Sequence, residues 1–596
     1  MLEPRSRWRF PVSVAPIPSL LQAGEELGLG PRVVALLAAR GLTEPDDLRR
    51  FLGDPAAGLH DPRRLPDADV FQARISSARE HGERVLVFGD FDADGITGLA
   101  ILTLALRRLG IDAIPYVPSR LEEGHGLSRA AVEAAIAAGA RVIVTVDTGS
   151  SSVEEVAVAN AAGIDVLITD HHRVPAVLPA ALAIVNPHRD GADYPDARLA
   201  GSGVAFTLAR LLLGEAALDF ADLAAIGTVA DLAPILGENR AIVQLGLAIL
   251  RSTPRPGLAA LLAAAKIAAA DVDLETLSFA LAPRLNAAGR VGEAFDAASL
   301  LLADSAEEAQ RLAAVLEAAN LTRRDQMKTA IAEARTSPDA VDDAAATVIH
   351  GPWPVGIVGL VASRLADERR RPAIVGADLG SVIRASCRSG GALHLADTLA
   401  ACSDLLLRHG GHAGAAGFEI ETERWPEFRE RFLALAAETA PPDPVATLDL
   451  DIALRGRDVD YALHRDLQKL APCGMGNPEP LVAVLGLTVT KVREVGGGHT
   501  SLVLKRRLDV LDGIAFGWPE LSRVVKEGDV IDVVAQLRSR RFGGIESLQL
   551  EIRDAALSGH HAESRAILDA GAVPVAVGPG PGSPAIAGPG PAVGAA

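Results

Sequence analysis

Short apolar segments alternate with longer helical patterns between residues 75 and 186. Four of these segments are rich in β-branched residues and follow polar turns, as buried strands do: Val85–Phe88, Arg141–Val146, Ile164–Thr169 and Ala181–Val185. Helices are predicted between them over Thr97–Leu109, Ser128–Ala138 and 152–162, with Ser128 as an N-cap. Because parallel neighbours need long crossover connections, this alternation predicts an α/β domain with a parallel sheet.

The pattern changes several times farther along the chain. Residues 201–300 are mostly helical, and Ser305–Arg335 has the composition of one long charged helix that could connect two domains. A second strand–helix alternation follows over 346–389, and short strands with turn signals between about 446 and 554 predict a small β-barrel or sandwich. The predicted parts are an accessory N-terminal region (1–74), a first α/β domain (75–303), a connector helix (304–337), a second α/β domain (338–440), a β-barrel domain (441–556) and a disordered tail rich in Pro, Gly and Ala (557–596).

Acidic residues stand at the ends of three predicted strands: Asp90, Asp92 and Asp94 after the first, Asp147 after the second, and Asp170-His171-His172 after the third. If the backbone stays extended beyond Phe88, the first three carboxylates project from one face. The carboxyl ends of parallel strands share one edge of the sheet, so all these groups are expected to converge there. Asp231, just before a turn at Pro234, is a further candidate carboxylate.

Like charges side by side are costly unless a cation lies among them, and hard divalent cations prefer carboxylate oxygen. The candidate ligands are Asp90, Asp92, Asp94, Asp147, His171 and Asp231. A mostly carboxylate set with one imidazole suits Mn²⁺ or Mg²⁺. Two such ions about 3.5–4 Å apart would polarise a phosphoryl oxygen and activate a bridging water, which predicts phosphodiester hydrolysis. The alternatives are a solvated acidic turn for the carboxylates and an ordinary core hydrogen bond for the histidine.

Composition narrows the class of protein. No apolar stretch reaches the roughly 18–20 residues of a membrane helix, and no signal peptide is evident, so we expect a cytoplasmic protein. The three cysteines are widely spaced, which predicts neither a disulfide framework nor a thiolate metal site. With 58 Lys and Arg against 76 Asp and Glu, the net charge is −18. Any nucleic-acid binding must therefore come from local cationic clusters rather than from overall charge.

Two segments could supply such binding. The Gly-rich loop Gly410–Gly417 could bring backbone amides close to phosphate, although it could equally be a tight turn; the nearby basic segment Ser381–Ser389 favours the phosphate interpretation. The β-barrel domain carries a local excess of cations: Lys491, Arg493, Lys505, Arg506, Arg507, Arg538, Arg540 and Arg541. A solvated face and a single-strand-binding barrel both fit them, and the few aromatic residues (Phe516, Trp518 and Phe542) weaken the second.

The order of these motifs resembles a known family. Asp90–Gly95, Asp147-Thr148-Gly149, Asp170-His171-His172 and the segment ending in Asp231 resemble the four motifs of the DHH phosphoesterase superfamily. The Gly410-Gly411-His412 loop resembles the domain associated with it. Together with Pro283–Arg290 and Cys473–Pro478, the layout is similar to the bacterial single-strand-specific exonucleases of that superfamily. Departures are His125 in place of an aromatic residue and Thr148 in place of a cysteine.

The resemblance implies a 5′→3′ exonuclease on single-stranded DNA that releases 5′-mononucleotides in recombination and repair. It implies that Asp94, Asp147, His171 and Asp231 hold one ion, that Asp92 and Asp147 with Asp90 hold a second, that His172 contacts the scissile phosphate, and that Arg290, Arg384, Ser386, Arg388, Gly410, Gly411 and His412 grip phosphates. It further implies an OB-fold for the β-barrel, a groove that admits one strand, a monomer without membrane contact, and recruitment by a single-strand-binding protein and a recombination helicase. The alternatives are a phosphodiesterase for oligonucleotides or cyclic dinucleotides and a non-catalytic single-strand-binding replication factor.

Overall fold

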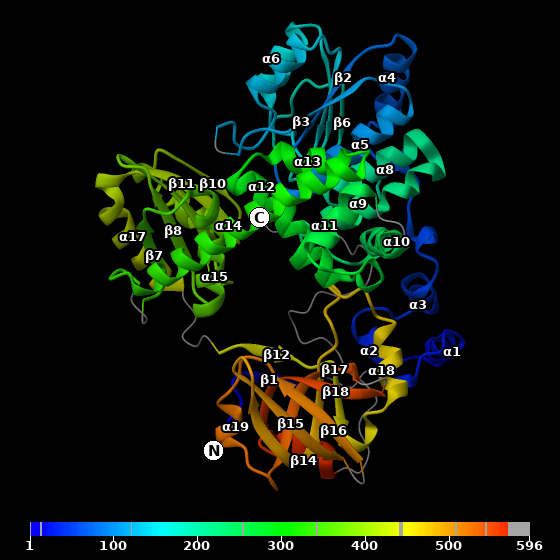
Figure 1. Ribbon diagram of the computed structural model, residues 1–596, viewed down its shortest axis with the longest axis vertical. Helices are drawn as coiled ribbons and strands as arrows, with labels where there is room; N and C mark the ends of the chain where they lie inside the picture. Colours follow the sequence, from blue (N-terminus) through cyan, green and yellow to red (C-terminus); the bar gives the residue numbers. More distant parts are fainter. Residues whose placement is uncertain are drawn as a thin grey trace. The chain divides into compact units, whose positions relative to one another are not determined.

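The computed structural model describes residues 2–11, 15–120, 122–252, 255–340, 344–391, 393–439, 445–506, 509–542 and 545–569. The chain forms two compact units (Figure 1). One unit joins Met1–His60, Leu232–Gln244 and Val445–Ala596, and the other joins Asp61–Asp231 and Leu245–Pro444. No described helix is both long and apolar enough to cross a membrane.

A five-stranded parallel sheet begins the second unit, as the alternation of strands and helices predicts. The strands pair in the order β3-β2-β4-β5-β6. Their bounds are β2 Val85–Gly89, β3 Ala113–Tyr116, β4 Val142–Val146, β5 Asp165–Thr169 and β6 Ala183–Val185. The sequence pattern missed β3, which is an edge strand that contains Pro115. Because proline cannot donate a hydrogen bond to a neighbouring strand, it is tolerated in an edge strand but not in a central one.

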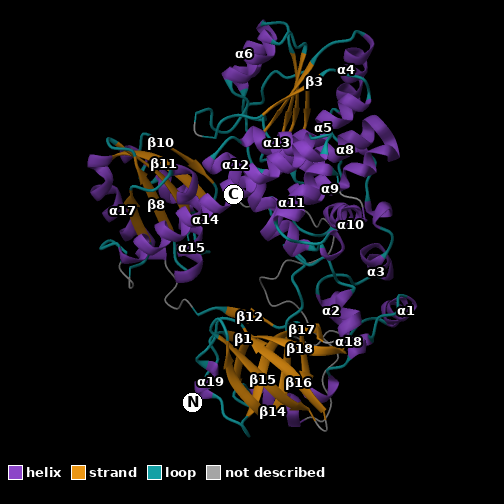
Figure 2. Cartoon of the chain, in the orientation of Figure 1, coloured by secondary structure: helices purple, strands orange, loops and turns teal. Residues whose placement is uncertain are grey.

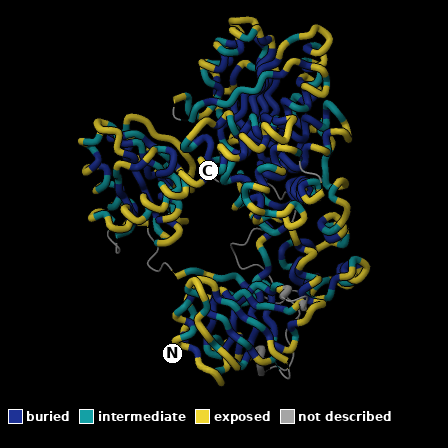
Figure 3. Tube along the Cα trace, in the orientation of Figure 1, coloured by how far each residue is buried: buried dark blue, intermediate teal, exposed yellow. Residues whose placement is uncertain are grey.

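Helices cover both faces of this sheet. Apolar residues of β2 pack with α6 (Arg129–Ala137) and α7 (Val153–Ala161) in one core, while α5 (Ala93–Arg108) and α8 (Gly201–Leu213) pack against the strands separately. Every residue of β2 and β4 is buried, and Figure 3 draws the centre of this domain in dark blue. Burial on both faces explains why these strands are almost continuously apolar.

A helical layer follows the sheet. Its helices are α9 Ala221–Ala230, α10 Gly237–Ser252, α11 Pro256–Ala264, α12 Ala282–Val291 and α13 Ala294–Leu302. Pro283–Arg290, which looks like a polar insertion in the sequence, is therefore helical. The predicted connector is α14 (Ala306–Thr336), about 46 Å long, and the Ser305 hydroxyl caps it by accepting the Glu308 N–H.

The second α/β domain contains a mixed sheet, ordered β10-β11-β9-β8-β7. The strands are β7 Thr347–Gly351, β8 Ala373–Asp378, β9 Val382–Arg388, β10 Arg408–Gly411 and β11 Ala415–Glu421. The helices are α15 Val355–Arg369, α16 Leu395–Ala400 and α17 Trp425–Thr439. The predicted loop Gly410–Gly417 is thus a β-hairpin in which Gly411 pairs with Ala416.

The other unit is built on a β-barrel (Figure 2). Its strands are β13 Ile452–Arg455, β14 Val482–Val495, β15 His499–Arg506, β16 Asp509–Ala515, β17 Val530–Phe542 and β18 Ile545–Leu557. Pairing of β14 with both β15 and β17 closes five of these strands into a barrel. Helices α18 (Tyr461–Gln468) and α19 (Leu521–Val524) flank it.

The N-terminal segment packs with this barrel rather than standing apart. β1 (Arg7–Arg9) pairs with β12 (Thr447–Asp449), and α1 (Pro18–Glu26), α2 (Pro31–Ala39) and α3 (Pro45–Leu52) share a hydrophobic core with the barrel strands. Residues beyond His60, including α4 (Ala68–Glu80), belong to the other unit.

Two predictions concern residues near the edges of the described ranges. Part of the tail predicted to be disordered is ordered: Leu557 ends β18 and Ala562–Asp569 form helix α20, while residues 570–596 lie outside the described residues. Arg507 of the basic cluster also lies outside them.

Candidate active site

The sequence pattern suggested that the acidic residues after β2 continue the strand, but they do not. Helix α5 begins at Ala93 because the Asp92 carboxylate acts as its N-cap, accepting the N–H groups of Asp94 at 3.0 Å and Gly95 at 3.1 Å. The three carboxylates therefore do not alternate along one strand face. They stay together because the strand end and the first helical turn adjoin.

The Asp94 side chain bridges two helices. Its oxygens accept the N–H groups of Gly201 at 2.7 Å and Ser202 at 3.0 Å, which begin α8. A helix N-terminus stabilises an anion, so this contact holds a carboxylate that is 1% exposed. Both oxygens are consequently fixed in direction before any cation binds.

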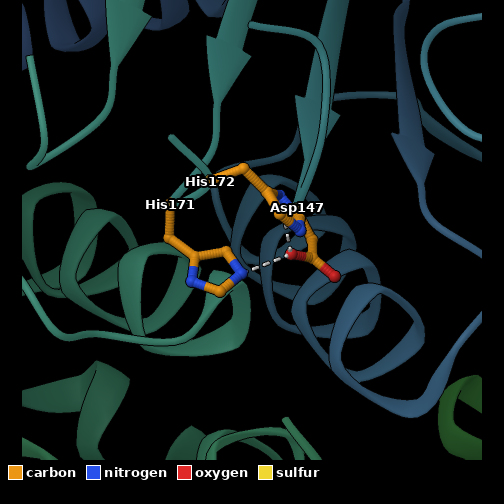
Figure 4. Close-up of side chains that lie close together, drawn as sticks. All are labelled: Asp147, His171 and His172. Atoms are coloured by element: carbon orange, nitrogen blue, oxygen red, sulfur yellow. Dashed lines mark ion pairs between the residues drawn. The ribbon is translucent and has the colours of Figure 1, made fainter. Parts of the chain in front are cut away.

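Asp147 and His171 lie in contact at the ends of β4 and β5. The His171 Nε2 atom is 3.0 Å from Asp147 Oδ1, and both histidines of the strand end point toward this carboxylate (Figure 4). Asp147 has a left-handed backbone (φ 62°), which is costly for a residue other than glycine. The chain also leaves no room beside it, because a Cβ on Gly201 would lie 2.5 Å from the Asp147 Cβ.

Seven residues form three overlapping groups, and within each group the candidate ligand atoms lie within 4.8 Å of one another. These groups are Asp94 with His171 and Asp231, Asp90 with Asp92 and Asp147, and Asp147 with His171 and His172. Asp231 comes from the C-cap of α9, with its Oδ2 3.9 Å from His171 Nδ1. The structure thus brings together every metal ligand that the sequence predicts.

Several of these atoms are buried without a hydrogen bond. Among the residues that the structure describes, Asp90 Oδ1, Asp147 Oδ1 and His171 Nε2 have no hydrogen-bond partner, although the last two are close neighbours. Buried polar atoms are nearly always satisfied, so unsatisfied ones that face a common space indicate a missing partner. Carboxylate and imidazole donors fit Mn²⁺ or Mg²⁺ at this point.

The pKa values of the carboxylates also indicate a site for a cation. Burial, followed by repulsion from Asp90 and Asp94, raises the pKa of Asp92 to about 6. Burial and the neighbouring Asp94 raise the pKa of Asp231 to about 7, and the pKa of the buried Asp147 rises well above its usual range for the same two causes. Without a cation, the charged forms of these carboxylates are therefore disfavoured.

His172 is held differently. Its Nδ1 lies 2.8 Å from the Asp170 carboxylate, which raises the pKa of His172 to about 9 despite partial burial. Burial would raise the pKa of Asp170, but hydrogen bonds from His172 and the Ser150 N–H hold it well below its usual range. The imidazolium is 54% exposed, so it presents a fixed positive charge to a ligand.

A cleft of about 870 Å³ opens onto these residues. One wall contains Asp90, Asp147 and His172, and the wall from the second α/β domain contains predicted phosphate-binding residues: Arg384, Ser386, Arg388, Gly410, Gly411 and His412. Arg384 and Arg408 both bind Glu419 there, and Arg388 donates to the Ser363 hydroxyl at 3.0 Å. The cleft therefore brings the two predicted sets of residues face to face.

Arg290 does not line this cleft. Its guanidinium donates to the Gly356 carbonyl at 3.0 Å, and burial lowers its pKa to about 9, assisted by repulsion from Arg120. It thus lies beside the cleft wall at the start of α15, close to other cations.

Sequence reasoning missed Arg120, which does line the cleft. Its guanidinium lies 4.0 Å from the ring centroid of Phe91, and its buried Nε forms no hydrogen bond with any described residue. Burial lowers its pKa, while the charges of Asp92 and Asp90 oppose that shift. Arg120 follows β3 and so lies at the same sheet edge as the acidic residues. Its position could have identified it as a site residue, but β3 was not recognised in the sequence.

Comparison with known proteins identifies three parts of the chain. Residues 84–228 match the DHH family N-terminal domain, residues 342–438 the DHHA1 domain, and residues 450–554 the RecJ OB domain. The single-stranded-DNA-specific exonuclease RecJ of Salmonella typhimurium is 35% identical over 88% of this chain and 96% of its own length. RecJ of Bacillus subtilis is 36% identical over 90% of this chain and 69% of its own length. The crystal structure of Thermus thermophilus RecJ with Mn²⁺ aligns with a TM-score of 0.79 and 31% identity, over 93% of this chain and 81% of that one. The chain therefore belongs to the RecJ family of single-stranded-DNA-specific exonucleases, which combine DHH, DHHA1 and OB domains.

Proposed function

We propose that this protein is a metal-dependent 5′→3′ exonuclease that hydrolyses single-stranded DNA to 5′-mononucleotides in recombination and repair. The observation that carries the proposal is a set of buried potential metal-ligand atoms, Asp90 Oδ1, Asp147 Oδ1 and His171 Nε2. They have no hydrogen-bond partner among the described residues and lie beside a cleft with arginines on its opposite wall. Relatives that share most of this chain are named single-stranded-DNA-specific exonucleases.

The donor set suits two divalent cations. Asp94, Asp147, His171 and Asp231 would hold one, and Asp92 and Asp147 with Asp90 would hold the other, consistent with the overlapping groups of close ligand atoms. Relatives have been crystallised with Mn²⁺ and with Mg²⁺. When bound, such ions polarise a phosphoryl oxygen and lower the pKa of a water.

The remaining residues act on the substrate. His172, held as an imidazolium by Asp170, would donate a hydrogen bond to an oxygen of the scissile phosphate. Arg384, Ser386 and Arg388 would bind further phosphates across the cleft, with the hairpin at Gly410, Gly411 and His412 beside them. Arg120 and Arg290 add charge near the acidic residues. These local cations account for binding by a chain whose net charge is −18.

The barrel would bind another part of the DNA strand than the reacting phosphate. Lys491 and Arg493 on β14 and Lys505 on β15 are exposed, and Phe516 is 55% exposed whereas Trp518 is buried. Charged and aromatic groups on a barrel surface suit a single strand. A cytoplasmic location, a monomeric state and recruitment by a single-strand-binding protein and a recombination helicase stay predictions.

Digestion of end-labelled DNA tests the proposal. Single strands labelled at the 5′ or the 3′ end, and a blunt duplex, are incubated with Mn²⁺, with Mg²⁺ or with EDTA. The expected result is immediate release of the 5′ label as a mononucleotide from single strands, with the duplex intact and no reaction in EDTA. Initial release of the 3′ label, or equal digestion of the duplex, would contradict the proposal.

A further inference from the structure

Asn186 lies at the end of β6, next to the strand end that carries His171 and His172, and has no role in the site described above. Asn186 begins the segment Asn186-Pro187-His188, and its side chain is fully buried. The Asn186 Nδ2 donates to the His172 carbonyl at 2.9 Å and to the Ser150 hydroxyl at 3.2 Å. Its Oδ1 accepts the His188 N–H at 2.9 Å.

The two main-chain contacts settle how the amide is oriented. A main-chain carbonyl can only accept and a main-chain N–H can only donate, so the nitrogen must face His172 and the oxygen must face His188. The two donor hydrogens and the acceptor oxygen are all in use. An amide that is buried and bonded in this way acts as a rigid restraint.

The restraint acts on the histidine pair. Ser150, bonded to Asn186 through its hydroxyl, donates its N–H to Asp170 Oδ2 at 3.0 Å. Asp170 Oδ1 in turn accepts the N–H groups of His171 at 2.8 Å and His172 at 3.1 Å. The main chain of the pair is therefore held through its N–H groups by Asp170 and through the His172 carbonyl by Asn186.

We infer that Asn186 is a positioning residue, which acts through this network to aim the His171 and His172 imidazoles at Asp147. The inference rests on the proposed metal centre. A rotation of the strand end would move His171 Nε2 away from its present separation of 3.0 Å from Asp147 Oδ1. Residues that orient metal ligands typically change metal affinity or activity by about 10- to 100-fold when replaced.

The test is the variant Asn186→Asp in the full-length protein. It keeps the size and the acceptor oxygen but replaces the donor with an anion that faces the His172 carbonyl. We expect Mn²⁺ affinity, measured by calorimetry without DNA, to fall about tenfold or more, and kcat on single-stranded DNA to fall about 10- to 100-fold with KM within twofold. Excess Mn²⁺ should restore part of kcat.

A control variant tests whether loss of any asparagine–carbonyl bond in this domain has the same effect. Asn160, which is exposed, donates its amide to the Ala180 carbonyl at 2.8 Å, away from the histidines. Asn160→Asp should therefore leave Mn²⁺ affinity and kcat within twofold of the wild type, whatever its effect on melting temperature. Asn186→Ala provides a second variant if Asn186→Asp does not fold, and circular dichroism checks folding in each case.

The outcomes are distinct. Wild-type Mn²⁺ affinity and kcat in both folded Asn186 variants would overturn the inference, as would equal losses in Asn160→Asp. If the wild-type protein itself bound no Mn²⁺, the proposed metal centre would fail instead.

Discussion

Removal of one carboxylate from the metal centre should stabilise the protein when no metal is present. Asp92 is the most informative choice because asparagine at an N-cap is as favourable as aspartate, so Asp92→Asn keeps the cap on α5 and removes only the charge. The pKa of Asp92 is raised from 3.8 to about 6. This rise in the pKa corresponds to about 3 kcal/mol of unfavourable free energy for the ionised form.

The sign of the pH dependence follows from this shift. Because the folded state binds the proton more tightly, the stability contributed by Asp92 is present below pH 3.8 and is lost as the pH rises through about 6. The metal-free wild type should therefore lose stability between about pH 4 and pH 7. Asp92→Asn should lose less, and by pH 8 it should be the more stable protein by up to about 3 kcal/mol.

Scanning calorimetry in EDTA and in Mn²⁺ measures the effect. We expect Asp92→Asn to melt above the wild type in EDTA at pH 8 and to gain less from Mn²⁺, since bound ligand stabilises a protein by about 2.7 kcal/mol at 100 times its Kd. The control is Asp222→Asn, which removes the carboxylate paired with Arg255 at 2.8 Å and should destabilise in both conditions. A lower melting temperature for Asp92→Asn than for the wild type in EDTA at pH 8 would refute the reasoning.

Four further predictions test other parts of the site. Asp147→Ala should abolish hydrolysis with an unchanged circular dichroism spectrum, and substantial residual cleavage would contradict the shared ligand. Gly227→Ala places a Cβ 2.2 Å from Ser202 Oγ, so the free energy of unfolding measured in urea should fall by about 1–3 kcal/mol and Mn²⁺ affinity should fall with it. Arg388→Ala should raise KM for single-stranded DNA about tenfold with little change in kcat, because it removes a charged hydrogen bond; steady-state kinetics showing the reverse split would count against a binding role. A variant comprising residues 61–444 should bind single strands at least about tenfold more weakly by fluorescence anisotropy but cleave bound strands at a similar rate in single turnover; an equal loss of both would mean that the barrel assists the chemistry.

The sequence was most informative where one interaction dominates. The buried strands before Asp90, Asp147 and Asp170 have continuous apolar runs, and their order along the chain predicts which side chains meet at one sheet edge. Hydrophobic burial decides these elements, and it is visible in a single sequence. The N-cap at Ser128 and the connector helix after Ser305 follow equally local rules.

The errors arose where a local cap was overlooked or where tertiary contacts decide. Asp92 looked like part of a strand, but capping of α5 turns the chain into a helix one residue later. The glycines from Gly410 to Gly417 suggested a loop, yet pairing with β9 makes that segment part of a sheet. Arg120 was missed because β3, the strand that precedes it and brings it to the edge with the acidic residues, was not recognised.

The central claim is that carboxylates and a histidine from separate strands and helices bind a pair of divalent cations. Anomalous diffraction at the manganese edge, from crystals of the wild-type protein soaked in Mn²⁺, tests it most directly. The account predicts two peaks about 3.5–4 Å apart, bridged by Asp147, with His171 and Asp231 at one and Asp92 at the other. Peaks located elsewhere, or none at Asp147, would contradict it.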